Sequence, residues 1–221
     1  VIGVNALESG KAAAATSSKM SAWLEIGADG VPILRTTKLS AGNGTNASLV
    51  MFLCEELDYD PLSVRIELAD ITRDAGKEPV YSPQSGFVTW FAGRAGGLRE
   101  AIQQAGASGR ERLRMAAARK WDIAVSEVVC QAGEVLHSGS GRSLNYGELA
   151  AEAASIVLAE EPAIKPPAEW KLMGKRSIRQ PNTGLKVDGS GIYGIDVQVP
   201  GMLYAAVLQA PVQGARLRSF N

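Results

Sequence analysis

The chain has 221 residues, of which 46% are hydrophobic and 21% charged, as in an ordinary soluble globular protein. Lysines and arginines number 23, equal to aspartates plus glutamates, so the charge gives no support for nucleic-acid binding, and no apolar run reaches the roughly 18 residues of a membrane span. A single histidine, His137, excludes a histidine-rich metal site in this chain, and two cysteines, Cys54 and Cys130, are too few for a disulfide framework. We interpret both cysteines as buried apolar side chains, with one disulfide between them as the alternative.

The first 20 residues are rich in alanine and leave two interpretations open. Their apolar start, followed by small residues, resembles the end of a secretory signal whose charged beginning would lie upstream of Val1. Alternatively, they form a disordered N-terminal arm. We expect residues 1–20 to be one or the other, and the folded part to begin at residue 21.

The first elements expected are two strands joined by a tight turn. Residues 22–26 and 31–37 favour strands and flank the sequence Gly-Ala-Asp-Gly, whose last residue, Gly30, is free to take a positive φ. This pattern predicts a β-hairpin.

A glycine turn comes after the hairpin and precedes a helical pattern. Gly42 and Gly44 carry no Cβ and so allow a ligand to approach the backbone. The apolar positions of the helix fall on one face: Leu49, Val50, Leu53 and Leu57. We expect Thr45 or Asn46 to be the N-cap. Unpaired N–H groups and the positive end of the helix dipole make the turn a candidate anion site, and the alternative is a plain turn without a ligand.

A strand, a loop and a long helix are expected next. Residues 63–68 alternate in polarity and predict a strand, whereas residues 70–85 predict a long loop. Residues 98–121 are helical in pattern, and Gly106 and Gly109 are placed to allow close packing against a neighbouring element. We interpret the basic residues of this helix as a solvated face: Arg110, Arg112, Arg114, Arg119 and Lys120.

A second hairpin is expected from residues 125–131 and 134–138, around an Ala-Gly pair. Asn145 as N-cap and Glu148 at the third helical position predict a capping box for a helix that runs to about residue 158, with Val157 on its inward face.

The remaining residues contain a boundary and two further strand patterns. Three prolines between residues 160 and 167 mark the best domain boundary, and residues 191–197 and 202–209 have strand patterns. The order of elements predicts an α+β fold, in which helices pack on one face of a mixed sheet.

Four segments of the chain carry a family resemblance. Residues 22–68 combine the opening hairpin, the sequence AGNG and a helix containing EEL; residues 98–123 begin LREAI and end AAARKWDI; residues 133–154 contain NYGELA; and residues 186–220 contain KVDGSG and PGMLYA. In this order they resemble the large subunit of the molybdenum hydroxylases (xanthine oxidase family), of the isoquinoline 1-oxidoreductase and bacterial aldehyde dehydrogenase type.

The resemblance implies a domain plan for the N-terminal part of such a subunit. Residues 21–160 would form the molybdopterin-binding-type α+β domain, residues 161–185 a linker, and residues 186–221 the beginning of an α/β hammerhead-like domain. The arm or signal remnant, residues 1–20, would precede them.

The resemblance also implies an oxidoreductase that hydroxylates an aldehyde or an N-heterocycle with oxygen from water. Its cofactor would be molybdenum held by molybdopterin cytosine dinucleotide. Its partners would be the remaining part of the large subunit, a small subunit with two-iron iron–sulfur clusters, and often a cytochrome c subunit for electron transfer. Subunits of this kind often carry an export signal, so the expected location is the periplasm.

The family's M-G-Q-G turn, whose backbone contacts the cofactor, corresponds to the predicted glycine turn. The cofactor-binding residues implied are Ala41, Gly42, Asn43, Gly44 and Thr45. Two positions depart from the family, since alanine replaces methionine and asparagine replaces glutamine. A second family loop, T-G-G-S, falls at residues 89–92, which are Thr-Trp-Phe-Ala.

No catalytic residue and no metal ligand is expected within these 221 residues. No position matches the family's G-x-G-E motif, which carries the general base. The acidic pairs Glu55-Glu56 and Glu160-Glu161 are interpreted as solvated charges.

Two other functions stay open beside the enzyme subunit. The departures at both loops favour a non-catalytic scaffold subunit that keeps the fold without the cofactor contacts. The glycine turn alone would also allow a nucleotide-phosphate binder unrelated to molybdenum, although the chain lacks G-x-G-x-x-G and a P-loop lysine motif.

Overall fold

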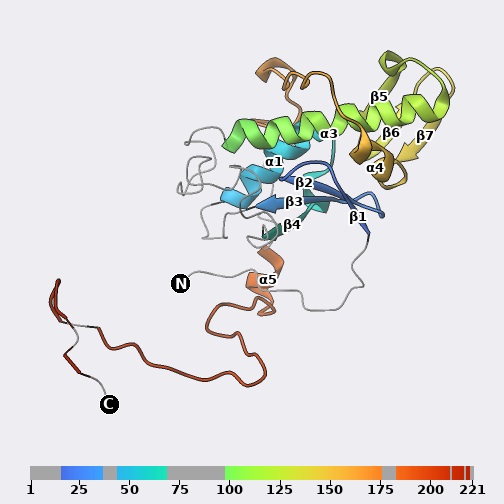
Figure 1. The fold of residues 1–221 in the computed structure, drawn as a ribbon. Helices are drawn as coiled ribbons and strands as arrows, with labels where there is room; N and C mark the ends of the chain where they lie inside the picture. Colours follow the sequence, from blue (N-terminus) through green and yellow to red (C-terminus); the bar gives the residue numbers. More distant parts are fainter. Residues whose placement is uncertain are drawn as a thin grey trace.

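The computed structural model forms two β-sheets and three main helices, α1, α3 and α4, followed by an extended C-terminal segment (Figure 1). The residues that it describes are 16–36, 44–68, 98–175, 183–209, 211–216 and 218–219.

The larger sheet is mixed, as the sequence predicts. Its four strands are β1 (Ser17–Lys19), β2 (Leu24–Gly27), β3 (Pro32–Thr36) and β4 (Arg65–Leu68), in that spatial order. The first two pairings are antiparallel, while β3 and β4 are parallel. The expected hairpin is confirmed as β2 and β3, with Gly30 at φ 81° in the turn. The expected arm is wrong for Ser17–Lys19, because these residues pair with β2.

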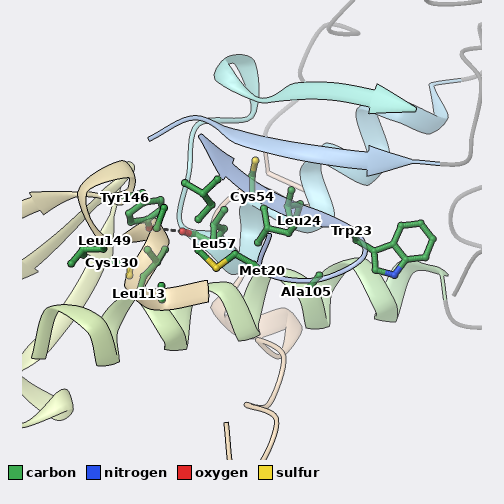
Figure 2. Packing of buried hydrophobic residues seen from close by; sticks show 14 of the residues in the cluster. Met20, Trp23, Leu24, Cys54, Leu57, Ala105, Leu113, Cys130, Tyr146 and Leu149 are labelled. Carbon is green, nitrogen blue, oxygen red and sulfur yellow. Dashed lines mark hydrogen bonds between the residues drawn. The ribbon is translucent and has the colours of Figure 1, made fainter. Parts of the chain in front are cut away.

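Helix α1 (Thr45–Leu57) and the short 3-10 helix η1 (Pro61–Ser63) connect the parallel strands β3 and β4. The apolar face predicted for α1 is confirmed, since Leu49, Val50, Leu53 and Leu57 are fully buried. In Figure 2, Leu24 of the sheet lies between Leu57 and Trp23, above the long helix that carries Ala105 and Leu113. The core therefore lies between the larger sheet and its helices.

The long helix α3 (Leu98–Trp121) has the bounds that its periodicity predicts, and it packs closely against α1. A Cβ added to Gly106 would lie 2.7 Å from the backbone oxygen of Leu53, and one added to Gly109 would lie 2.7 Å from Cδ2 of Leu24. The prediction that these glycines permit close packing is confirmed.

Three arginines of α3 contradict the predicted solvated face. The guanidinium groups of Arg110, Arg112 and Arg114 donate to backbone oxygens of Glu56, Met20 and Val128 at 2.6, 2.7 and 2.8 Å, so each joins α3 to another element. Arg119 and Lys120 are exposed, as expected.

The smaller sheet contains β5 (Val128–Gln131), β6 (Glu134–His137) and β7 (Arg142–Asn145), all antiparallel, and the 3-10 helix η4 (Val125–Glu127) precedes it. The second predicted hairpin is confirmed as β5 and β6, although its first three residues belong to η4, and β7 was not predicted. The free thiols of Cys54 and Cys130 are buried, so the disulfide alternative is wrong.

Helix α4 (Tyr146–Ser155) starts with the predicted capping box. Asn145 accepts from the Gly147 N–H at 2.8 Å, and Glu148 accepts from the Asn145 N–H at 2.8 Å. The helix ends three residues earlier than expected, and Val157 is 90% exposed, contrary to the predicted inward position. The fully buried Tyr146 hydroxyl donates to the backbone oxygen of Leu57, which ties α4 to the end of α1 (Figure 2).

The C-terminal segment contains the short helices η5 (Pro167–Glu169) and α5 (Thr183–Val187), then extends away from the sheets (Figure 1). The strands predicted at residues 191–197 and 202–209 are wrong, because a strand requires a neighbour and no described strand lies beside them. Most of their apolar side chains are exposed, and Leu208 is 99% accessible. The domain limits at residues 161 and 186, and the hammerhead-like domain, stay predictions.

Candidate functional site at the start of α1

The start of α1 lies at a position that suits ligand binding. Strand β3 ends at Thr36 beside its parallel neighbour β4, and α1 begins at Thr45 and returns the chain to the start of β4. In sheets with parallel strands, ligands bind outside the carboxyl ends of the strands, where helix N-termini gather. Gly44 and the start of α1 therefore come, along the chain, after the carboxyl end of β3.

Two of the five expected cofactor-binding residues, Gly44 and Thr45, belong to the described chain, whereas residues 41–43 lie outside it. Gly44 is the N-cap of α1, with φ 78° and ψ 8° in the left-handed region. Glycine adopts this conformation without the steric cost that a Cβ would bring. Residues 89–92, where the family's second loop falls, also lie outside the described chain.

The predicted N-cap is wrong. Thr45 and Asn46 are the first two residues of the helix itself, and the N-cap, Gly44, makes no side-chain cap hydrogen bond. Because a glycine has no side chain to accept from the N–H groups, the helix start depends on something other than its own N-cap for their partners.

Asn46 supplies a second observation at the same place. Its side-chain Oδ1 is buried and has no hydrogen-bond partner among the described residues. A buried polar atom of this kind requires a partner to offset its lost hydration. The first turn of α1 also contains no acidic residue that would repel an anion. A buried acceptor without a partner among the described residues, in the first turn of a helix, fits a ligand that donates a hydrogen bond there.

The opposite end of α1 corrects the prediction for Glu55 and Glu56. Both side chains are buried, with 1% and 0% of their surface exposed, and are not solvated. Glu55 accepts three backbone N–H groups, from Lys171, Leu172 and Met173.

Glu56 is a structural carboxylate by its contacts. It accepts from the Lys165 N–H at 2.9 Å, and Arg110 lies 3.4 Å away. Burial raises the pKa of the Glu56 carboxyl, while its hydrogen bond from Lys165 and the charge of Arg110 oppose that rise. With these partners, Glu56 is committed to holding the chain together and is no candidate for a general base.

The second acidic pair is exposed, as expected, although Glu161 accepts hydrogen bonds from Gln104 and Ser108 of α3. Within the described ranges, no three His, Cys, Asp or Glu side chains come together as a metal site. None of the helices in those ranges combines the length and apolar character that crossing a membrane requires.

A mixed sheet whose parallel edge pair, β3 and β4, is connected through a helix with a glycine N-cap is typical of a cofactor- or anion-binding domain. Residues 1–197 match the family model of the molybdopterin cofactor-binding domain, and the chain belongs to this family. The resemblance to the molybdenum hydroxylases is confirmed by this match.

Two curated relatives support the same family. Isoquinoline 1-oxidoreductase subunit beta of Brevundimonas diminuta is 31% identical over 228 residues, which cover 87% of this chain and 28% of the relative. The membrane-bound aldehyde dehydrogenase [pyrroloquinoline-quinone] of Gluconacetobacter polyoxogenes is 26% identical over 205 residues, which cover 90% of this chain and 25% of the relative. The chain thus spans about a quarter of the length of these relatives.

Among solved structures, quinoline 2-oxidoreductase from Pseudomonas putida 86 aligns with a TM-score of 0.39 and 17% identity, over 61% of this chain and 15% of that one.

Proposed function

We propose that this chain forms part of the molybdopterin-binding subunit of a molybdenum hydroxylase, an oxidoreductase acting on an aldehyde or an N-heterocycle. The family match carries the proposal, and the names of the two relatives supply the two substrate classes. When bound, the molybdenum cofactor supplies the two-electron oxidation of the substrate carbon with oxygen from water.

The residues of this chain would bind and orient that cofactor. Backbone N–H groups of the turn Ala41, Gly42, Asn43, Gly44 and Thr45 would donate to its pterin or phosphate oxygens, supported by the positive end of the α1 dipole. The orphaned Oδ1 of Asn46 would accept from an N–H or O–H of the same molecule. The chemistry itself would use groups outside these residues.

The finer expectations belong to the same proposal. The cofactor would be the cytosine dinucleotide form, and the partners would be the remaining part of the large subunit, a small iron–sulfur subunit and a cytochrome c subunit. The name "subunit beta" of one relative favours a complex with other subunits. The complex would be exported to the periplasm, which fractionation of the cells would test.

The direct test is elemental and cofactor analysis of the intact purified complex. We expect molybdenum and a released cytosine nucleotide, together with oxidation of an aldehyde or N-heterocycle. The other relative's name includes pyrroloquinoline-quinone, so the released material should also be assayed for a quinone. Well-folded complex that contains a quinone and no molybdenum would contradict the proposal.

A matched pair of variants assigns the site. Gly44→Ala places a Cβ on a left-handed residue at the start of α1, and Gly141→Ala does the same at φ 68° in an open turn with nothing within 4 Å. Both changes carry the same backbone strain. We expect only Gly44→Ala to lower the molybdenum and nucleotide content. An equal loss in both variants would remove the evidence for cofactor binding at Gly44.

The scaffold is the second candidate, because asparagine and alanine occupy the family's glutamine and methionine positions. It predicts that Asn43→Gln changes neither cofactor content nor activity. A rise in either quantity in that variant would exclude the scaffold.

A further inference from the structure

The last turn of α1 carries an arrangement of charge that is unfavourable for a helix by itself. Glu55, Glu56 and the following Asp58 place three acidic side chains at the negative end of the helix dipole, and the last turn holds no basic residue. Two of these carboxylates are buried, and a buried carboxylate destabilises the fold unless it is paired or hydrogen-bonded. The compensation has to come from elsewhere in the chain.

It comes from residues 161–173, which we call the strap. Glu55 receives three of the strap's backbone N–H groups: Oε1 accepts from Lys171 at 2.8 Å, and Oε2 accepts from Leu172 at 2.8 Å and Met173 at 2.9 Å. Three donors that converge on one buried carboxylate form a strong, charge-assisted anchor for the end of the strap.

Lys165 anchors the middle of the strap. Its ammonium group donates to the backbone oxygen of Glu55 at 2.5 Å and to Asp58 Oδ2 at 2.9 Å, while its backbone N–H donates to Glu56 Oε1 at 2.9 Å. One lysine therefore contacts all three acidic residues and supplies the positive charge that the helix end lacks. A second ammonium group, that of Lys171, lies 2.9 Å from Asp58 Oδ1.

The beginning of the strap is attached to α3. The side-chain amide of Gln104 donates to the backbone oxygen of Pro162 at 2.8 Å. The guanidinium of Arg99 lies 5.2 Å from the ring centroid of Trp170, whose indole N–H donates to the Lys165 backbone oxygen at 3.0 Å. The strap is thus fixed at its start, middle and end.

The attachment depends on polar contacts more than on apolar burial. Met173 is the one buried residue between 161 and 173, and the other side chains are exposed or partly exposed. A segment with little apolar burial opens at a low free energy compared with a core helix, so the loss of one strong polar anchor can release it.

We propose that residues 161–173 dock on the domain as a releasable strap, and that the Glu55 carboxylate is the latch that holds it. Docking fixes the position of the buried Met173, and with it the point from which the chain continues toward α5. The strap therefore acts as a positioning device between this domain and the C-terminal segment, independently of which cofactor the protein binds.

Limited trypsin digestion of the full-length protein tests the strap. The side chain of Lys171 is 68% exposed, but the Lys171–Leu172 peptide bond is restrained because its N–H donates to Glu55. In Glu55→Gln, an NH₂ donor replaces one acceptor oxygen and faces the strap's N–H groups. The control is Glu160→Gln, an exposed acid just before the strap that loses the same charge. Cleavage is monitored by mass spectrometry at the Lys171–Leu172 bond and inside α3, after Arg112.

We expect Glu55→Gln to raise the cleavage rate after Lys171 by about tenfold or more, as the loss of one buried, charge-assisted hydrogen bond implies. Cleavage after Arg112 should not change, and the control should match the wild type at both bonds. An unchanged rate after Lys171 would overturn the latch. Equal acceleration at both bonds would overturn release as a separate unit, because the whole domain would then be opening.

Discussion

Gly106 is the position where the closest approach of α1 and α3 can be tested with one atom. Gly106→Ala adds a Cβ at 2.7 Å from the Leu53 backbone oxygen and 2.8 Å from the Glu56 Cβ, both on α1. Alanine improves intrinsic helix propensity by about 1 kcal/mol over glycine. The backbone of α1 cannot move aside as a side chain can, so the contact of the added Cβ with α1 should lower the free energy of unfolding by about 2–3 kcal/mol. We expect a net loss of roughly 1–2 kcal/mol.

Gly109→Ala in the same helix is the matched control. Its Cβ would meet Leu24 Cδ2 at 2.7 Å and Leu57 Cδ1 at 3.4 Å, which are the ends of side chains that can change rotamer. The same propensity gain of about 1 kcal/mol should then offset most of the packing cost, and the expected change is within about 0.5 kcal/mol of zero.

Hydrogen exchange of the α3 amides in the full-length protein, measured by mass spectrometry, gives the opening free energy of this helix for each variant. The prediction is a lower opening free energy for Gly106→Ala than for Gly109→Ala. If the two variants are equally stable, or Gly106→Ala is the more stable one, the backbone contact between α1 and α3 does not limit the spacing of these helices.

Three further predictions concern α4, Glu56 and the cysteines. Asn145→Ala removes the acceptor for the Gly147 N–H and should destabilise the start of α4 by about 1 kcal/mol. Asn145→Ser should retain most of this stabilisation, because serine is also a good N-cap. Hydrogen exchange of the α4 amides measures the stability of the helix start in both variants. Burial raises the pKa of Glu56 in the folded state, so the folded protein binds this proton more tightly than the unfolded chain does. The contribution of Glu56 to the free energy of unfolding therefore falls as the pH rises from the unfolded-state pKa through the folded-state pKa. Above the ordinary glutamate range, the thermal midpoint of Glu56→Gln should therefore decline less with rising pH than that of the wild type, and parallel curves would contradict the assigned burial. Burial raises the pKa of the Cys130 thiol to about 12 and that of the Cys54 thiol further. Neither thiol should therefore react with iodoacetamide at pH 8 in the native protein, whereas both should react in urea. Rapid labelling of the native protein would contradict the placement of these cysteines in the core.

The regular elements were predictable where the sequence repeats with a clear period. The apolar face of α1 and the full length of α3 follow from the 3.6-residue recurrence, and the capping box follows from Asn145 and Glu148 alone. These signals depend on residues that are close in sequence, so no tertiary knowledge was needed.

The burial of Glu55 and Glu56 was not predictable in this way. Two acids near a helix end are most often solvated, and their partners in the strap are more than 100 residues away in the chain. The same holds for Arg110, Arg112 and Arg114, whose acceptors are backbone oxygens of other elements. A charged side chain that bonds the main chain leaves no pattern in the sequence.

The candidate site was predictable in part. The helix after the glycine turn was predicted correctly, and the cofactor site proposed at its start stays a prediction. The N-cap was assigned to side chains and belongs to Gly44. Glycine competes as an N-cap when the preceding turn requires a left-handed residue, and this requirement is a property of the backbone path. The unpartnered Oδ1 of Asn46 could be found only from its burial.

The most direct test of the cofactor assignment is an experimental structure of the full-length, cofactor-loaded protein. The quantity to measure is the distance from the main-chain nitrogen of Gly44 to the nearest oxygen of the cofactor. We predict a hydrogen bond, at about 2.7–3.2 Å, to a pterin or phosphate oxygen of molybdopterin. A cofactor bound elsewhere, with the amides of residues 42–44 facing solvent, would contradict the account and leave only the family fold.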